Sequence, residues 1–266
     1  DFGSNTIHSS AQLFPEDSTR GPITLFAKLH MRSLPSNPMR GNSLLAIPHF
    51  LKNRLIRPFR SIYFPFIFSV APEKEAETFY STLITKDDVV VEVGARLGAG
   101  TLVLSRLAKH VYSFEPNKDS FRVLKHYTKQ CKNVDIYNLA VGEKDSSAWL
   151  NKITKYDFSA SASLTELADY EYGDKQMVKM IPLDSFTFTE PPTCLLLDCE
   201  GYESHVLDGA PKMIQKVTKA LVETHILKDG SNTSIEVKRK LSGSFDRTSQ
   251  TNLEGVNWII FTKTAN

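Results

Sequence analysis

The chain has 266 residues, of which 41% are hydrophobic and 23% are charged, and its net charge is +2. These values are those of an ordinary globular protein, and they exclude a disordered chain, a collagen and a polytopic membrane protein. The charge is uneven, because residues 1–72 carry eight basic and three acidic side chains, whereas residues 73–266 carry 24 basic and 27 acidic ones. We therefore expect a basic N-terminal arm or subdomain, residues 1–72, and a larger domain with a different role, residues 73–266.

The N-terminal part changes character along its length. Residues 1–42 are rich in Ser, Pro, Asn and Gly, which is typical of an irregular arm. Residues 43–71 combine apolar side chains with four basic ones, Lys52, Arg54, Arg57 and Arg60. Such a stretch can lie in a membrane interface, but Pro58 and Pro65 would break a long amphipathic helix. We expect an arm packed on the domain, and peripheral membrane contact through residues 43–71 is the alternative.

The cysteines and the first residues of the chain bear on its location. Cys131, Cys194 and Cys199 form no CxxC pair and are too few for a disulfide framework. Residues 1–20 are polar and lack the apolar core of a signal peptide. Both observations favour reduced thiols in a cytoplasmic protein, with a membrane-peripheral location left open by residues 43–71.

From residue 73 onward, strand and helix patterns alternate. Buried strands are expected at residues 88–93, 110–114, 134–141, 194–197, 220–223 and 256–262. Helices are expected at residues 73–83, 101–109, 118–130, 204–216 and 234–241. The polar segment 245–252 is expected to pair antiparallel with the last strand, and residues 142–182 to form a short hairpin plus a mobile insertion. This order predicts an α/β fold, an open parallel sheet with helices on both faces and a ligand at the carboxyl ends of the strands.

A glycine-containing loop joins the first strand to the next helix and reads Glu92-Val93-Gly94-Ala95-Arg96-Leu97-Gly98-Ala99-Gly100. Glycines at such a turn let backbone N–H groups approach a ligand closely. Roughly 20 residues further on, Glu115 ends the second strand, where a carboxylate can accept hydrogen bonds from a ribose diol. The loop, the acid and their spacing together predict a nucleoside-containing cofactor.

Two cofactors fit this pattern. The spacing Gly94-x-x-x-Gly98-x-Gly100 also occurs in short-chain dehydrogenases that bind NAD(P), which need a Tyr-x-x-x-Lys pair. No tyrosine after the loop has a lysine four residues on, so an NAD(P)-dependent oxidoreductase is the less favoured reading. Glu92 lies in an apolar strand and needs a partner. Its carboxylate would repel a pyrophosphate but suits the ammonium of S-adenosylmethionine (SAM).

Five segments carry a further signal: DVVVEVGARLGAGTLVLSRLAKHVYSFEPN, NLAVG, IPLDSF, LLLDCEGYESHVLDGA and ALVETH. Together they resemble the FkbM family of SAM-dependent methyltransferases, over residues 75–226, and the segment that contains DCEGYE is the most specific. Two positions depart from the family pattern, which usually has Asp where Glu92 stands and Asn where Arg96 stands. Residues 1–72 have no counterpart in the resemblance.

The resemblance implies a Rossmann-like class I methyltransferase sheet of seven strands, the last one antiparallel, with the N-terminal part as an extension. It also implies methyl transfer from SAM, most often to a hydroxyl oxygen of a small molecule or a sugar-containing acceptor. Carried over by position, the residues around the methionine part of SAM would be Glu92, Gly94, Ala95 and Gly98. Glu115 would hold the ribose, and Ala140 would border the adenine.

Acidic residues and a histidine follow two neighbouring strands of the predicted sheet. Asp198 and Glu200 come after the fourth strand, and Glu223 and His225 end the fifth. Methyl transfer requires a group that aligns the acceptor and removes its proton. We expect Asp198, with His225, to do this, and Glu200 is a further candidate. A divalent cation could instead bind to Asp198, Glu223 and His225, but we do not favour this interpretation. The charges of Glu200 and Glu203 could also simply complement a helix dipole.

Two other classes of protein remain as alternatives. A binding module without chemistry would show gaps in the glycine loop or in the acids after the strands, and neither is seen. A nucleic-acid methyltransferase would use the basic N-terminal arm, but the acids Asp198 and Glu200 would repel phosphates. A small-molecule acceptor is therefore expected.

Overall fold

The computed structural model describes residues 74–153, 162–168, 170–253 and 255–264. The larger sheet contains β1 (Val89–Val93), β2 (His110–Phe114), β3 (Val134–Tyr137), β8 (Cys194–Leu197), β9 (Lys219–Thr224), β10 (Arg247–Leu253) and β11 (Val256–Thr262). The helices are α2 (Lys74–Ser81), α3 (Ala99–Leu107), α4 (Lys118–Thr128), α5 (Glu203–Asp208), α6 (Pro211–Lys216) and α7 (Thr233–Leu241). The expectations for residues 1–72, and for the part of the mobile insertion at residues 154–161, lie outside the described residues.

The order of strands in the larger sheet is β10-β11-β9-β8-β1-β2-β3. β1 lies in the middle and pairs parallel with β2 on one side and with β8 on the other. β8 pairs parallel with β9, and β11 runs antiparallel to both of its neighbours, β9 and β10. This confirms the predicted Rossmann-like sheet of seven strands with an antiparallel last strand.

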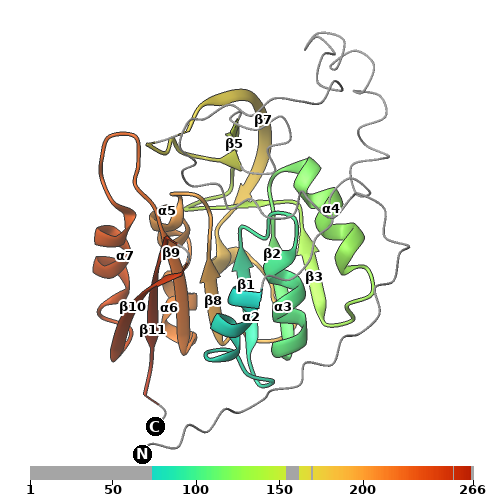
Figure 1. Ribbon diagram of the computed structural model, residues 1–266, viewed down its shortest axis with the longest axis vertical. Coiled ribbons are helices and arrows are strands. Elements are labelled where there is room, and N and C mark those ends of the chain that lie inside the picture. Colours follow the sequence, from blue (N-terminus) through green and yellow to red (C-terminus); the bar gives the residue numbers. More distant parts are fainter. Residues whose placement is uncertain (1–73, 154–161, 169, 254, 265–266) are drawn as a thin grey trace, which may run out of the picture. The chain divides into compact units, whose positions relative to one another are not determined.

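The central strand β1 shows why helices cover both faces of the sheet. All five of its residues are buried, as expected for a strand between two layers of helices. Val89, Val91 and Val93 belong to the core under α5, α6 and α7, and Val90 packs in the core under α2 and α3 (Figure 1). Burial of each such side chain contributes about 1.5–3 kcal/mol. Because side chains alternate along a strand, Glu92 faces the same side as Val90.

A second, smaller sheet lies above the carboxyl ends of the parallel strands (Figure 1). It consists of β4 (Ala140–Val141), β7 (Tyr172–Ile181), β5 (Ser146–Ile153) and β6 (Ala162–Ser163), in the order β4-β7-β5-β6. Its core is formed by Ala140, Leu150, Val178 and Met180. The hairpin expected within residues 142–182 is present, and β5 and β7 pair antiparallel from Ser146 to Ile153. The hairpin is therefore longer than expected.

The prediction of a single strand over residues 134–141 was wrong. β3 ends at Tyr137, and the chain enters the other sheet at Ala140. The side-chain amide of Asn138 donates hydrogen bonds to the backbone carbonyls of Glu115 (2.8 Å) and Pro116 (3.0 Å). These bonds hold a turn at the end of β3 and direct the chain into β4.

The prediction of one helix over residues 204–216 was also wrong, because α5 ends at Asp208 and α6 begins at Pro211. Proline cannot continue a helix but suits the first position of a new one. Gly209 permits the close approach at this break, since a Cβ atom there would lie 1.9 Å from the carbonyl oxygen of Gly142.

In the part of the chain that the structure describes, no helix is both long and apolar enough to cross a bilayer.

Candidate active site

The loop after β1 and the turn after β8 touch at the carboxyl edge of the sheet. The backbone N–H of Asp198 donates to the carbonyl of Val93 at 3.0 Å. Gly94 has a φ of 98°, and a Cβ atom at this position would lie 1.7 Å from the carbonyl oxygen of Asp198. Only glycine fits both the left-handed backbone and the close approach. The glycine loop thus places the end of β1 against the turn after β8. This turn carries Asp198 and Glu200 and is called the acidic turn below.

Glu115 lies at the end of β2, where the neighbouring backbone fixes its carboxylate. One oxygen accepts a hydrogen bond from the N–H of Arg96 (2.8 Å), and the other accepts one from the N–H of Asn117 (2.7 Å). Burial raises the pKa of Glu115 to about 8, and these two hydrogen bonds oppose the rise only in part. Each carboxylate oxygen has a second lone pair, so the ionised group can still accept hydrogen bonds from a diol.

A pocket opens between the acidic turn, Glu115 and the smaller sheet. Its polar lining includes Arg96, Glu115, Asp198 and Glu200, and its apolar wall includes Leu139, Ala140, Val141 and Leu150. The structure therefore brings together Gly94, Glu115, Ala140, Asp198 and Glu200, which the sequence singles out separately. The other three predicted cofactor residues, Glu92, Ala95 and Gly98, do not line this pocket.

Glu92 lies under the loop rather than in the pocket. One oxygen of its carboxylate accepts hydrogen bonds from the hydroxyls of Thr101 (2.6 Å) and Ser113 (2.6 Å). Burial raises the pKa of Glu92, and the two hydroxyls oppose the rise. The partner that this buried acid requires is thus supplied by α3 and β2. Sequence reasoning missed both hydroxyls, although Ser113, inside an apolar strand, is a signal of a buried polar pair.

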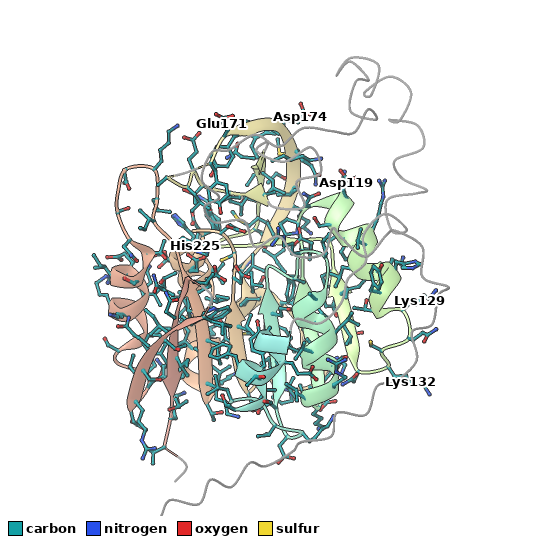
Figure 2. The ribbon with its side chains drawn as sticks, viewed as in Figure 1. Asp119, Lys129, Lys132, Glu171, Asp174 and His225 are labelled. Atoms are coloured by element: carbon teal, nitrogen blue, oxygen red, sulfur yellow. The ribbon has the colours of Figure 1, made fainter. Side chains whose placement is uncertain are left out.

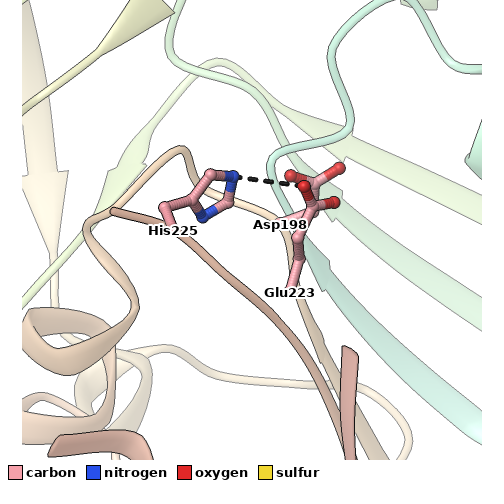
Figure 3. A group of neighbouring side chains, drawn as sticks. All are labelled: Asp198, Glu223 and His225. Atoms are coloured by element: carbon pink, nitrogen blue, oxygen red, sulfur yellow. Dashed lines mark ion pairs between the residues drawn. The ribbon is translucent and has the colours of Figure 1, made fainter. Parts of the chain in front are cut away.

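His225, just after β9, lies below the smaller sheet (Figure 2), and Figure 3 shows it beside Asp198 and paired with Glu223. Its Nε2 is 3.2 Å from Glu223 Oε1 and 3.7 Å from Glu200 Oε2, and its Nδ1 is 3.0 Å from Glu203 Oε1. The Nδ1 contact is an ion pair without the alignment of a hydrogen bond. Burial lowers the pKa of His225, but Glu203 and Glu223 more than offset this and raise it well above its ordinary value. The two carboxylates therefore favour the protonated form of the imidazole.

Glu203 is the buried anchor of this cluster. Its side chain has no exposed surface, and its Oε1 also accepts a hydrogen bond from the N–H of Gly201 at 2.9 Å. Burial alone would raise the pKa of Glu203, but the charge of His225 lowers it below its usual value. Glu203 lies in the first turn of α5, as its interpretation as a charge that complements the helix dipole requires. The sequence did not indicate its second partner, His225, which follows β9.

Asp198 lies on the other side of the same cluster. Burial raises the pKa of its carboxyl well above the usual value, and the charges of Glu223 and Glu200 raise it further. His225 and Arg96 act in the opposite direction. A carboxyl group of this kind accepts a proton more readily near neutral pH than an ordinary aspartate does.

Three of these side chains could also hold a metal ion. One donor atom each from Asp198, Glu223 and His225 lies within 4.8 Å of the other two, and carboxylates with an imidazole suit several divalent cations. A metal would have to displace the proton from His225, which is already paired with carboxylates on both ring nitrogens. A proton and a metal ion therefore compete for the imidazole of His225, and we assign no metal to this cluster.

The fold and the pocket define a class of protein, the Rossmann-like methyltransferases. The family profile described as the methyltransferase FkbM domain matches residues 92–242, more than half of the chain. The chain belongs to the FkbM methyltransferase family. This membership confirms the predicted resemblance and the SAM-dependent methyltransferase class, with SAM rather than NAD(P) as the cofactor.

Solved structures agree on the fold. The chain is similar to the methyltransferase FkbM from Methylobacillus flagellatus, with 14% identity, a TM-score of 0.52, and coverage of 74% of this chain and 50% of that one. It thus spans about half the length of that protein. A weaker likeness is to SMU.1697c from Streptococcus mutans in complex with SAH, with 14% identity, a TM-score of 0.46, and coverage of 74% of this chain and 100% of that one. Another is to the tRNA (m1A58) methyltransferase TrmI from Aquifex aeolicus, with 11% identity, a TM-score of 0.46, and coverage of 77% of this chain and 76% of that one. No curated protein matches the sequence.

Proposed function

We propose that the protein transfers the methyl group of SAM to a hydroxyl oxygen of a small-molecule or sugar-containing acceptor. The observation that carries this proposal is that Glu115 and Asp198 line one pocket at the carboxyl edge of the sheet. When ionised, Glu115 can accept hydrogen bonds from the two hydroxyls of a diol. Asp198 supplies a second carboxyl group, whose pKa is raised. These are the two requirements for holding a nucleoside and activating a hydroxyl.

The residues present fit SAM. Glu115 would bind the ribose diol through its free lone pairs, and the small side chain of Ala140 with its apolar neighbours would border the adenine. Gly94, where a Cβ cannot be placed, leaves backbone at the centre of the pocket. Glu92, Ala95 and Gly98 would shape the loop from outside the pocket lining. When bound, SAM supplies an electrophilic methyl group on a cationic sulfur.

Asp198 is the proton acceptor in this proposal, and His225 is its positioning residue. The support is the arrangement of the cluster: Glu203 and Glu223 lie at the two ring nitrogens of His225 and favour its protonated form, which leaves Asp198 as the better proton acceptor. Asp198, with a raised pKa, can take the proton of an acceptor hydroxyl as the oxygen attacks. Glu200 lines the same pocket and is the next candidate.

The acceptor class follows from the charge of the pocket. Asp198 and Glu200 would repel the phosphates of a nucleic acid or any other anionic acceptor. Carboxylates accept hydrogen bonds from hydroxyl groups, so a neutral polyol or a phenol-type hydroxyl suits this pocket. An acceptor screen with SAM labelled in its methyl group tests the proposal, and an O-methylated product is expected. A label found only on nucleic acid or on nitrogen would contradict it, and activity abolished by EDTA and restored by Mg²⁺ would transfer the activating role to a metal.

At pH 9, where the carboxyl of Glu115 is ionised, replacing Glu115 with glutamine is expected to weaken SAH binding by about 1.5–3 kcal/mol, because the amide loses the charge-assisted hydrogen bonds to the ribose. Isothermal titration calorimetry measures the change. Glu190→Gln is the matched control, since Glu190 pairs with Lys109 at the opposite edge of the sheet and should leave SAH binding unaltered. Equal affinities of Glu115→Gln and the parent protein would refute the ribose assignment.

The affinity for SAH is also expected to depend on pH. Below about pH 8 the buried carboxyl of Glu115 is protonated and cannot accept from both hydroxyls of a diol. Affinity should therefore rise with pH, by at most about tenfold per pH unit, and level off above pH 8. Titrations between pH 6 and 9 measure this slope, and Glu115→Gln should abolish it. A slope that persists in the variant would assign the titration to another group.

A further inference from the structure

Arg96 departs from the family pattern and occupies a strained position in the glycine loop. Its φ is 51°, in the left-handed region that non-glycine residues rarely adopt. Its backbone N–H donates to Glu115 at 2.8 Å. The backbone of Arg96 is thus fixed by the same carboxylate that the proposed function gives to the ribose, and its side chain begins at the wall of the pocket.

The charge of Arg96 is unlike that of the other groups around it. Among the described residues that line the pocket, Arg96 is the only basic one, and the acids are Glu115, Asp198 and Glu200. Arg96 is close enough for its charge to act on all three carboxyls. No ion pair between described residues involves its guanidinium, which is exposed. A cation that forms no ion pair with any described residue therefore lines an acidic pocket.

We propose that Arg96 binds the carboxylate at the amino-acid end of SAM and SAH. That end carries an ammonium and a carboxylate, and among the described residues that line the pocket Arg96 supplies the positive charge that a carboxylate requires. A guanidinium binds a carboxylate with two parallel hydrogen bonds, which an asparagine cannot do. The inference rests on the cofactor part of the proposed function and is independent of the acceptor.

Two ligands separate this role from a general effect on the loop. SAH carries the carboxylate, and 5′-S-(3-aminopropyl)-5′-thioadenosine has the same nucleoside, sulfur and ammonium but lacks it. Binding of both to the full chain is measured by calorimetry for the parent, Arg96→Asn, Arg96→Lys and a control, Arg106→Asn. Asparagine tolerates the left-handed backbone, and Arg106 pairs with Glu77 near the far end of α3.

Arg96→Asn is expected to weaken SAH binding by about 10- to 100-fold and to change binding of the analogue by less than about twofold. Arg96→Lys should retain part of the affinity for SAH, because it keeps the charge but loses the forked geometry. Arg106→Asn should bind both ligands like the parent. Unchanged SAH affinity in Arg96→Asn, or an equal loss for both ligands, would overturn the inference alone. A parent protein that binds neither ligand would overturn the proposed cofactor site as well.

Discussion

Replacing Asp198 with asparagine is expected to lower the rate of methyl transfer by about 10²- to 10⁴-fold, the usual effect of removing a general base. Asparagine preserves the shape of the side chain but cannot accept the proton of the acceptor hydroxyl. The affinity for SAH should stay within a few fold, because the ribose site at Glu115 is unaltered. Steady-state kinetics with an acceptor from the screen, together with calorimetry of SAH binding, measure both quantities.

Two further variants make this result specific. Asp208→Asn removes an acid at the end of α5 that pairs with Lys240 on the surface, and it should turn over like the parent protein. His225→Gln should also lower turnover, with a changed pH profile, because the loss of its cation alters the proton affinity of Asp198. If Asp198→Asn retains near-parent turnover, the base lies elsewhere, and Glu200 becomes the stronger candidate.

Replacing Gly94 with alanine is expected to lower the free energy of unfolding by about 2–5 kcal/mol. A left-handed backbone costs an alanine about 1–2 kcal/mol, and overpacking of a tight contact adds about 1–3 kcal/mol. The added Cβ would lie 1.7 Å from the carbonyl oxygen of Asp198, and because the obstacle is backbone, the loop or the acidic turn must move. Chemical denaturation measures the loss, and SAH binding should weaken with it.

The chain supplies a matched control for the steric part of this effect. Gly230 also has a left-handed φ, of 84°, but a Cβ there would meet no atom within 4 Å. Gly230→Ala should therefore show only the backbone cost of about 1–2 kcal/mol and bind SAH normally. Similar losses in the two variants would show that the contact between Gly94 and the acidic turn contributes nothing.

Much of the fold was predictable because its signals are local. The apolar run of β1, the glycines after it and the acid that ends β2 lie within one short stretch, and the parallel order follows from alternating strands and helices. The carboxyl ends of β8 and β9 likewise predicted that Asp198 and His225 would be neighbours. Gly94, Glu115 and Ala140, which the family resemblance places around the cofactor, line the pocket.

The features that were not predicted depend on contacts distant in sequence. The turn that splits residues 134–141 is held by hydrogen bonds from Asn138 to the end of β2. The buried Glu203, at the start of α5, pairs with His225, which follows β9. One oxygen of Glu92 accepts hydrogen bonds from hydroxyls of α3 and β2. Spacing and composition do not encode such partners, since each depends on which faces of two elements meet.

Isothermal titration calorimetry of the full chain with SAH, and separately with NAD, shows whether the pocket lined by Glu115 and Asp198 binds the nucleoside and amino-acid parts of SAM. We expect saturable binding of SAH at one site with a micromolar Kd, and no detectable binding of NAD. Absence of SAH binding at pH 8, or equal affinity for NAD, would contradict this expectation.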